Sequence, residues 1–320
     1  MKALVTGGAG FIGRHLVHGL LSRGHDVGVI DDSSRSGLAP FADGVTVTTA
    51  SILDADALDT AVAGSEVIFH EAAIASVARS LLEPRLTNDV NTNGTIEVMR
   101  AAARNGVRKV VFAGSSAVYG IPDALPCSES QRPAPRSPYG VSKLAAEHYV
   151  HALGEAFGIQ TAVLRYFNVY GPGQDPASEY AAVIPRFITA VLEGRRPMIN
   201  GKGDISRDFV YIDDVVEANL LASQAGVSPA LTCNIATGSP TSLDQLLRAV
   251  GVGVGTAVHP TLGPPRPGDI PHSYADIGLA RRALGYEPRT ALDDGIARTI
   301  DWYRGTSNLP TFTAGSRSGA

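Results

Sequence analysis

Residues 3–13 read ALVTGGAGFIG and decide the fold. Residues 3–6 predict a short strand, and residues 13–23 predict a helix that ends at Gly24. Between them lies a Gly-x-x-Gly-x-x-Gly turn. A strand, a glycine turn and a helix in this order bind the pyrophosphate of a dinucleotide, because the helix N-terminus faces the phosphates. The predicted cofactor-binding residues of this turn are Gly7, Gly10, Phe11, Ile12 and Gly13.

An acidic residue follows the second predicted strand, residues 27–30. Asp31 stands roughly 20 residues beyond the glycine turn, where a carboxylate accepts hydrogen bonds from the adenosine ribose and repels a 2′-phosphate. The cofactor is therefore predicted to be NAD rather than NADP. Asp32 is a second candidate for this role, or a solvated loop residue. Ser51 and Ile52, after the third strand, are predicted to border the adenine.

Strands and helices alternate through the first half of the chain. Further strands are predicted at residues 45–49, 67–70, 110–113 and 161–165, and helices at 55–63, 91–105 and 138–157. This alternation predicts right-handed crossovers and a doubly wound parallel α/β sheet of the Rossmann type. A smaller substrate-binding lobe is also expected, and the chain is expected to pass between the two parts more than once. We predict an NAD-binding domain at 1–165 with 208–238 returning to it, a nucleotide-sugar-binding lobe at 166–207 and 239–304, and a flexible tail at 305–320.

Tyr139 and Lys143 are predicted to lie on one face of a helix, because residues four apart are neighbours on a helix surface. A free tyrosine ionises near pH 10, so it needs neighbouring positive charge to act as a base at neutral pH. Lys143 and a nicotinamide ring would supply that charge. A surface Tyr–Lys pair is the alternative, but the glycine turn upstream and Ser115 at the end of a strand favour a catalytic pair.

Composition excludes several other classes. The net charge of −4 argues against a nucleic-acid or membrane-surface partner. The two cysteines are far apart in the sequence, so neither a disulfide framework nor a zinc site is expected, and a cytoplasmic location is predicted. The eight histidines show no metal-like pair, so no metal is expected. No apolar run approaches the roughly 20 residues of a membrane span.

Together these motifs resemble the extended short-chain dehydrogenase/reductase family, and within it the UDP-sugar 4-epimerases. The resemblance covers about residues 1–304. It rests on TGGAGFIG (6–13), HEAA (70–73), DVNTNGT (89–95), GSSAVYG (114–120), SPYGVSK (137–143), RYFNVYGPG (165–173), RDFVYIDDV (207–215) and RPGD (266–269). It implies a homodimer that joins through two helices of each subunit.

The resemblance also implies individual roles. Tyr139 is the expected base, Ser115 binds the sugar O4, and Lys143 also holds the nicotinamide ribose. Cofactor contacts are expected from Ala72, Ala73 and Asn91. The remaining substrate contacts are expected from Ser116, Asn168, Val183, Ile184, Arg207, Phe209, Arg266, Asp269 and Ser273. The two arginines and Asn168 suit a diphosphate, because guanidinium groups bind phosphate oxygens through paired donors.

The expected reaction is inversion at C4 of a UDP-hexose through a transient 4-keto sugar, with UDP-glucose, UDP-galactose or their N-acetyl forms as substrates. Related dehydratases carry Asp-Glu directly after the residue equivalent to Ser115, and decarboxylases carry a Glu; here Ser116 and Ala117 stand there. A UDP-glucuronate 4-epimerase, or another nucleotide-sugar dehydratase or reductase, is the alternative. A non-catalytic NAD-binding regulator would be expected to lack the Tyr–Lys pair.

Overall fold

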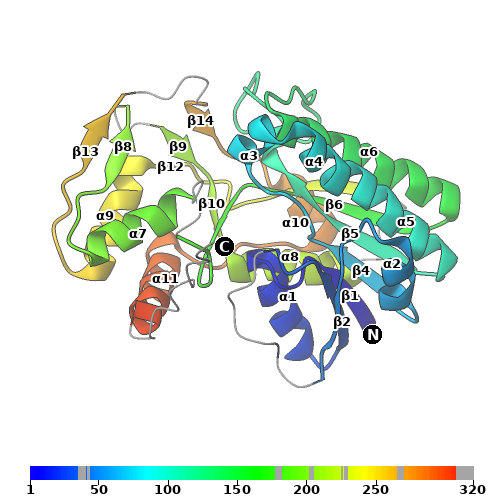
Figure 1. Ribbon diagram of the computed structural model, residues 1–320. Coiled ribbons are helices and arrows are strands. Elements are labelled where there is room, and N and C mark those ends of the chain that lie inside the picture. The colour runs from blue at the N-terminus through cyan, green and yellow to red at the C-terminus, as the bar shows by residue number, and fades with distance from the viewer. Residues whose placement is uncertain are drawn as a thin grey trace, which may run out of the picture.

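A seven-stranded parallel sheet forms the core of the larger part of the molecule, on the right in Figure 1. This computed structural model describes residues 1–34, 41, 44–176, 182–201, 205–224, 226, 230–264 and 270–307. The strand order is β11-β6-β5-β4-β1-β2-β3, and all pairings are parallel. The bounds are β1 Lys2–Thr6, β2 Asp26–Asp31, β3 Thr46–Thr49, β4 Val67–His70, β5 Lys109–Ser115, β6 Gln160–Tyr166 and β11 Ala230–Ile235. The order reverses between β1 and β4, where sheets of this kind bind ligands at their carboxyl ends.

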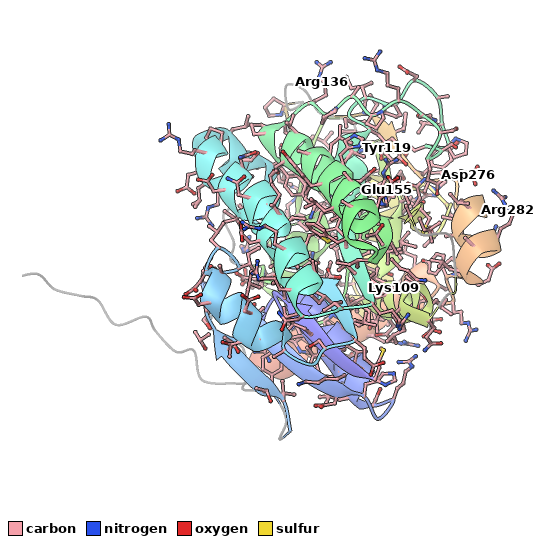
Figure 2. All side chains as sticks on the ribbon, turned by 90° about the vertical axis from the view of Figure 1, so that its right-hand side faces the viewer. Lys109, Tyr119, Arg136, Glu155, Asp276 and Arg282 are labelled. Atoms are coloured by element: carbon pink, nitrogen blue, oxygen red, sulfur yellow. The ribbon has the colours of Figure 1, made fainter. Side chains whose placement is uncertain are left out.

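Helices cover both faces of this sheet. On one face α1 (Phe11–Leu21) packs against α8 (Ile212–Gln224), and on the other lie α2 (Ala55–Val62), α5 (Gly94–Arg104) and α6 (Pro138–Phe157). Figure 2 looks onto the second face and shows α5 and α6 side by side. A hydrophobic core lies on each face of the sheet, and alternate residues of β1 point into them. Ala3 and Val5 belong to one core, and Leu4 belongs to the other. The predicted doubly wound sheet is thereby confirmed.

A smaller lobe lies beside the sheet (Figure 1). Its strands are β8 (Met198–Asn200) with β13 (Thr261–Gly263), and β9 (Ser206–Arg207) between β12 (Thr241–Ser242) and β14 (His272–Ser273). Its helices are α7 (Val183–Leu192), α9 (Leu243–Val254) and α11 (Leu292–Ser307). The strands β7 (Asn168–Tyr170) and β10 (Phe209–Tyr211) form a separate parallel pair. In the chain, β7 follows β6 and β10 follows β9.

Several details differ from the sequence expectations. The helix predicted from residue 91 begins as a π-helical turn, Asp89–Asn93, and becomes α5 only at Gly94. Two short helices, α3 (Val77–Leu82) and α4 (Pro84–Asn88), precede it. The helix α10 (Gly278–Leu284) packs against β11 and α8 of the large sheet. Helix α11 includes residues 305–307 of the predicted tail. No helix in the described part of the chain is long and apolar enough to cross a membrane.

Candidate active site

The glycine turn between β1 and α1 leaves room for a phosphate at one position. A Cβ on Gly7 would lie 2.6 Å from the Ala72 nitrogen, and one on Gly13 would lie 2.2 Å from the Gly7 oxygen. Both glycines are therefore needed for the backbone itself. At Gly10 the Gly7 oxygen, at 3.2 Å, is the only described neighbour within 4 Å of such a Cβ. The open side of Gly10 and the N-terminus of α1 fit a dinucleotide pyrophosphate.

Asp31 stands at the end of β2 beside that turn. Its carboxylate accepts hydrogen bonds from the Ala9 nitrogen at 2.9 Å and the Ser33 nitrogen at 2.8 Å. These two bonds fix the acid next to the glycine turn, where the sequence places the adenosine ribose. Asp32 is exposed and accepts a bond from the Ser34 nitrogen at 3.0 Å. Ile52 is buried, and its side chain lies where a Cβ on Gly94 would sit.

Helix α6 presents the Tyr–Lys pair because its start is defined by local sequence. Ser137 caps the helix by accepting a hydrogen bond from the Gly140 nitrogen at 3.1 Å, and Pro138 occupies the first turn. Tyr139 follows at once, and its phenol lies beside the Ser115 hydroxyl at the end of β5, which acts to lower the pKa of Tyr139. The structure therefore brings together two of the residues predicted to be catalytic, from β5 and α6.

Lys143 completes the trio one helical turn further on. It is 3% exposed, and its ammonium lies 4.2 Å from the centre of the Phe112 ring. Burial lowers the pKa of Lys143 to about 8, opposed by the charges of Glu71 and Glu147. Burial also raises the pKa of Tyr139, opposed by the Ser115 hydrogen bond. Burial therefore outweighs the groups that favour the phenolate and leaves Tyr139 protonated, and the positive charge of a bound nicotinamide ring would supply the further lowering of its pKa that a base requires.

Asn91 fastens α6 to the loop after β4. Its side-chain oxygen accepts a bond from the Ile74 nitrogen at 2.8 Å, and its amide donates to the Ser142 hydroxyl at 3.0 Å. The π-helical turn that contains Asn91 makes this reach, a geometry frequent at functional sites. Ala72 and Ala73, which are predicted to line the cofactor, are half-buried in the same loop, between the end of β4 and Ile74.

Two buried polar networks support the site and had no clear signal in the sequence. Glu147, four residues after Lys143, forms a two-bond ion pair with Arg165 of β6, with Nε–Oε2 at 3.0 Å. Arg165 also donates to the Tyr119 hydroxyl at 2.9 Å. Figure 2 labels Tyr119, near the carboxyl end of β5, and Lys109, at its other end. Glu147 lies one helical turn beyond Lys143 on the same side of α6, so the pair fastens the catalytic side of this helix to β6.

His70 belongs to the second network. Thr95 donates to the Asn91 carbonyl at 2.6 Å, so its hydroxyl accepts from Nε2–H of His70 at 2.9 Å. The other ring nitrogen, Nδ1, then accepts from the Thr6 hydroxyl at 2.7 Å. Burial and the charge of Lys143 lower the pKa of His70 to about 3. The imidazole is therefore neutral and ties β1, β4 and α5 together.

The substrate residues predicted from the sequence lie on several elements of the smaller lobe and at the edge of the large sheet. Arg207 on β9 and Ser273 on β14 are direct register partners. Asn168 is exposed at the start of β7, beside Phe209 on β10. Phe209 and Ile184 are buried, with Phe209 packed edge-on against Tyr170, while Val183 and Ser116 are half-buried. Arg266 and Asp269 lie outside the described residues.

Asp208 holds this lobe against the sheet, and sequence analysis missed it. Its carboxylate accepts hydrogen bonds from the Thr237 nitrogen at 2.8 Å, the Gly238 nitrogen at 2.9 Å and the Ala275 nitrogen at 3.2 Å. Asp208 thereby joins the segment after β11 to the segment after β14, directly beside Arg207. The available signal was an acid directly after Arg207 in the 207–215 motif.

A doubly wound sheet whose switch point carries a glycine turn, with a tyrosine and a buried lysine at the same edge, defines an enzyme that works with a dinucleotide. Residues 3–236 match the NAD dependent epimerase/dehydratase family, and the chain belongs to that family of nucleotide-sugar enzymes. Its cofactor is NAD.

Relatives match along almost the whole chain. The UDP-glucose 4-epimerase of Mycolicibacterium smegmatis is 41% identical, over 96% of this chain and all of its own. The structure of UDP-glucose 4-epimerase from Thermotoga maritima with UDP-glucose is 36% identical with a TM-score of 0.92, covering 96% and 100% of the two chains. The UDP-N-acetylglucosamine 4-epimerase of Methanobrevibacter ruminantium, in complex with UDP-N-acetylmuramic acid, is 34% identical with a TM-score of 0.91, covering 95% and 98%.

Proposed function

We propose that this protein is a UDP-hexose 4-epimerase acting on UDP-glucose and UDP-galactose, and also on their N-acetyl forms. The observation that carries the proposal is the placement of Ser115 at the end of β5 beside Tyr139, with the buried Lys143 one helical turn away and a turn without acidic residues, Ser116–Val118, directly after Ser115. The similarity to a UDP-glucose 4-epimerase over 96% of the chain supports it.

The three side chains divide the proton chemistry. Tyr139 removes the proton of the sugar O4, Ser115 shares the hydrogen bond to that oxygen, and Lys143 holds the nicotinamide ribose while its charge favours the phenolate. Bound NAD would supply the acceptor for the C4 hydride, which would return to the opposite face of the sugar as Tyr139 gives its proton back to O4. The 4-keto sugar turns between these two events while its diphosphate stays anchored, so the binding groups concentrate on the diphosphate.

The turn after β5 favours simple epimerisation over elimination of water. Ser115 caps a short 3₁₀ turn, Ser116–Val118, by accepting a hydrogen bond from the Ala117 nitrogen at 3.2 Å. Elimination needs an acid and a base poised beside the sugar in addition to the redox step. Ser116 and Ala117 cannot donate a proton in that way. This turn therefore favours the redox and rotation steps and offers no acid for elimination.

The substrate would enter along the smaller lobe. Arg207 and Ser273 are adjacent on β9 and β14, and Asn168 is exposed on β7. We propose that Asn168 and Arg207 bind the diphosphate together with Arg266, and that Asp269 holds the nucleoside ribose. Ser273 then borders the sugar, where its small side chain leaves room for an N-acetyl group.

A UDP-glucuronate 4-epimerase is the second candidate, and one observation favours it. Arg186 is exposed in the first turn of α7, close in sequence to Val183 and Ile184, which are expected to contact the substrate. A C6 carboxylate needs a cation or several donors when it leaves water. Arg186→Gln would weaken turnover of the uronate and spare UDP-glucose if Arg186 supplies that cation.

The decisive experiment is incubation of the purified protein and NAD with UDP-glucose, UDP-N-acetylglucosamine and UDP-glucuronate, followed by NMR of the C4 configuration. We expect the plain and N-acetylated sugars to equilibrate with their C4 epimers. Exclusive turnover of the uronate would select the second candidate. Formation of a dehydrated sugar, or no turnover of any sugar, would refute epimerisation, and the latter would favour a regulator.

We also propose that the protein is a cytoplasmic homodimer. Exposed apolar side chains occur on the neighbouring helices α3, α4 and α6, where a second copy would bury them: Val77, Leu81, Leu82, Leu86, Val141 and Tyr149. Light scattering behind size exclusion measures the mass in solution. Leu82→Glu should produce monomers if this face forms the interface, and a monomeric wild-type protein would contradict the proposal.

A further inference from the structure

Asp208 is a fully buried acid that stands between two strands carrying proposed substrate contacts. It is the one residue between β9, which ends at Arg207, and β10, which begins at Phe209. The proposed mechanism gives this acid no role. Its hydrogen bonds nevertheless reach several of the groups that would hold the substrate, and they fall into two sets, one from its backbone and one from its carboxylate.

The backbone of Asp208 joins the other proposed substrate residues. Its nitrogen donates to the Ser273 oxygen at 3.0 Å, and its oxygen accepts from the Asn168 nitrogen at 3.0 Å. Arg207, the residue before it, is in register with Ser273 and donates from its guanidinium to the Pro271 oxygen at 3.3 Å. One short segment therefore sets the spacing of three residues that are proposed to contact the diphosphate or the sugar.

The carboxylate of Asp208 anchors that segment to the rest of the molecule. Oδ1 accepts from the Thr237 nitrogen at 2.8 Å and from the Thr237 hydroxyl at 2.6 Å. Oδ2 accepts from the Gly238 nitrogen at 2.9 Å and from the Ala275 nitrogen at 3.2 Å. Thr237 and Gly238 follow β11 of the large sheet, and Ala275 is paired with Cys127. The substrate strands are thereby fastened to the large sheet.

The environment of Asp208 fits an ionised acid that acts only through its neighbours. All four bonds to the carboxylate come from donors, which is the pattern that a charged carboxylate accepts. Burial raises the pKa of Asp208, and the bonds from Thr237, Ala275 and Gly238 oppose that rise. The acid is 0% exposed, so it does not itself contact a bound nucleotide. Its effect on a substrate must therefore pass through the residues bonded to it.

We propose that Asp208 is a positioning residue for the nucleoside diphosphate, which fixes Arg207, Asn168 and Ser273 against the large sheet and so sets how tightly the diphosphate is held. The inference rests on the proposed binding of the diphosphate by Arg207 and Asn168. Binding groups from separate segments hold a ligand well when their spacing is set in advance, because ordering them on binding reduces affinity. In the proposed reaction this anchor must persist while the keto sugar turns.

The charge of Asp208 and its positioning role predict opposite effects on nucleotide binding. A diphosphate is anionic, so the removal of a negative charge by itself should strengthen binding. Loss of the bonds to the carboxylate should instead loosen Arg207 and Asn168, and so weaken binding. Asp208→Asn distinguishes the two effects. In either orientation its amide NH2 group would face at least one backbone N–H that now donates to the carboxylate.

The test is the dissociation constant of UDP, measured by isothermal titration calorimetry on the NAD-loaded protein without sugar. We expect Asp208→Asn to bind UDP about 10–100-fold more weakly, because a displacement of about 1 Å in a binding group can have an effect of that size. The affinity for NAD should be unchanged. With UDP-glucose, KM should rise by a similar factor and kcat should change much less, because Ser115, Tyr139 and Lys143 lie on β5 and α6.

Asp214→Asn is the matched control. Asp214 of α8 is also buried, and its carboxylate accepts from the Arg289 nitrogen at 2.9 Å and the Thr290 nitrogen at 3.2 Å, which are not among the proposed substrate residues. Both variants should unfold at a lower denaturant concentration than the wild type, but only Asp208→Asn should lose UDP affinity. Unchanged or tighter UDP binding in Asp208→Asn would overturn the proposal, as would an equal loss of UDP affinity in Asp214→Asn.

Thr237→Val is a milder variant, which replaces Asp208→Asn if the latter does not fold. It removes the hydroxyl that donates to Oδ1 of Asp208 and keeps the backbone donors. UDP binding should weaken by at least about 2-fold, and an unchanged affinity would then overturn the proposal. Binding of UDP requires no turnover, so the result does not depend on whether the protein epimerises a sugar. A wild-type protein that does not bind UDP would also overturn the inference.

Discussion

Alanine at two positions of the glycine turn should separate folding from cofactor binding. At Gly13 a Cβ would lie 2.2 Å from the Gly7 oxygen and 2.8 Å from the Gly8 Cα, whereas ordinary contacts begin at 3.4 Å. The obstacles are backbone atoms, so the turn must move by about 1 Å, at a cost of about 1–3 kcal/mol. Gly13→Ala should therefore be less stable even without NAD.

Gly10→Ala should behave differently. Gly10 has φ −71°, which alanine adopts readily, and its Cβ would come no closer than 3.2 Å to the described atoms around it. The variant should match the wild-type stability within about 0.5 kcal/mol. However, its methyl group would occupy the space that we assign to the pyrophosphate, so NAD binding should be lost.

Denaturant unfolding with and without NAD measures both effects. At an NAD concentration 100 times its Kd, the wild-type protein should gain about 2.7 kcal/mol, and Gly10→Ala should gain none. Gly305→Ala is the control, because a Cβ there meets no described atom within 4 Å and the site is in α11. If Gly10→Ala gains as much from NAD as the wild type, the pyrophosphate does not lie against Gly10.

Three further substitutions test the remaining roles. Tyr139→Phe should keep the fold and NAD but lower kcat by about 10²–10⁴-fold, and a variant with more than about a third of the wild-type rate would show that Tyr139 is not the base. Asp31→Ala should weaken NAD binding and reduce the preference for NAD over NADP, measured by titration with both cofactors. Unchanged affinities would show that Asp31 serves only to bond the Ala9 and Ser33 nitrogens. Ser273→Tyr should lower kcat/KM for UDP-N-acetylglucosamine and spare UDP-glucose, because the larger ring fills the space for the N-acetyl group; equal losses on both sugars would refute this.

The sequence by itself was sufficient for the features that depend on local rules. Hydrophobic strands alternating with helices predicted the parallel sheet, and the glycine turn predicted the cofactor site, since steric demands on Gly7 and Gly13 act within a few residues. The spacing of Tyr139 and Lys143 placed them on one helix face for the same reason. The conversion of residues 89–93 to a π-helical turn escaped prediction, because it depends on what Asn91 reaches in space.

Only the tertiary structure decided which distant groups meet. Residues from separate elements meet where Ser115 lies beside Tyr139, where Arg207 is in register with Ser273, and where the Tyr166 hydroxyl donates to Glu71. Burial likewise depends on the assembled core: it places Phe209 and Ile184 inside, and it raises the pKa of Tyr139 although a cation stands one turn away. Desolvation and long-range pairing arise from the packing of the whole chain, and no local pattern encodes them.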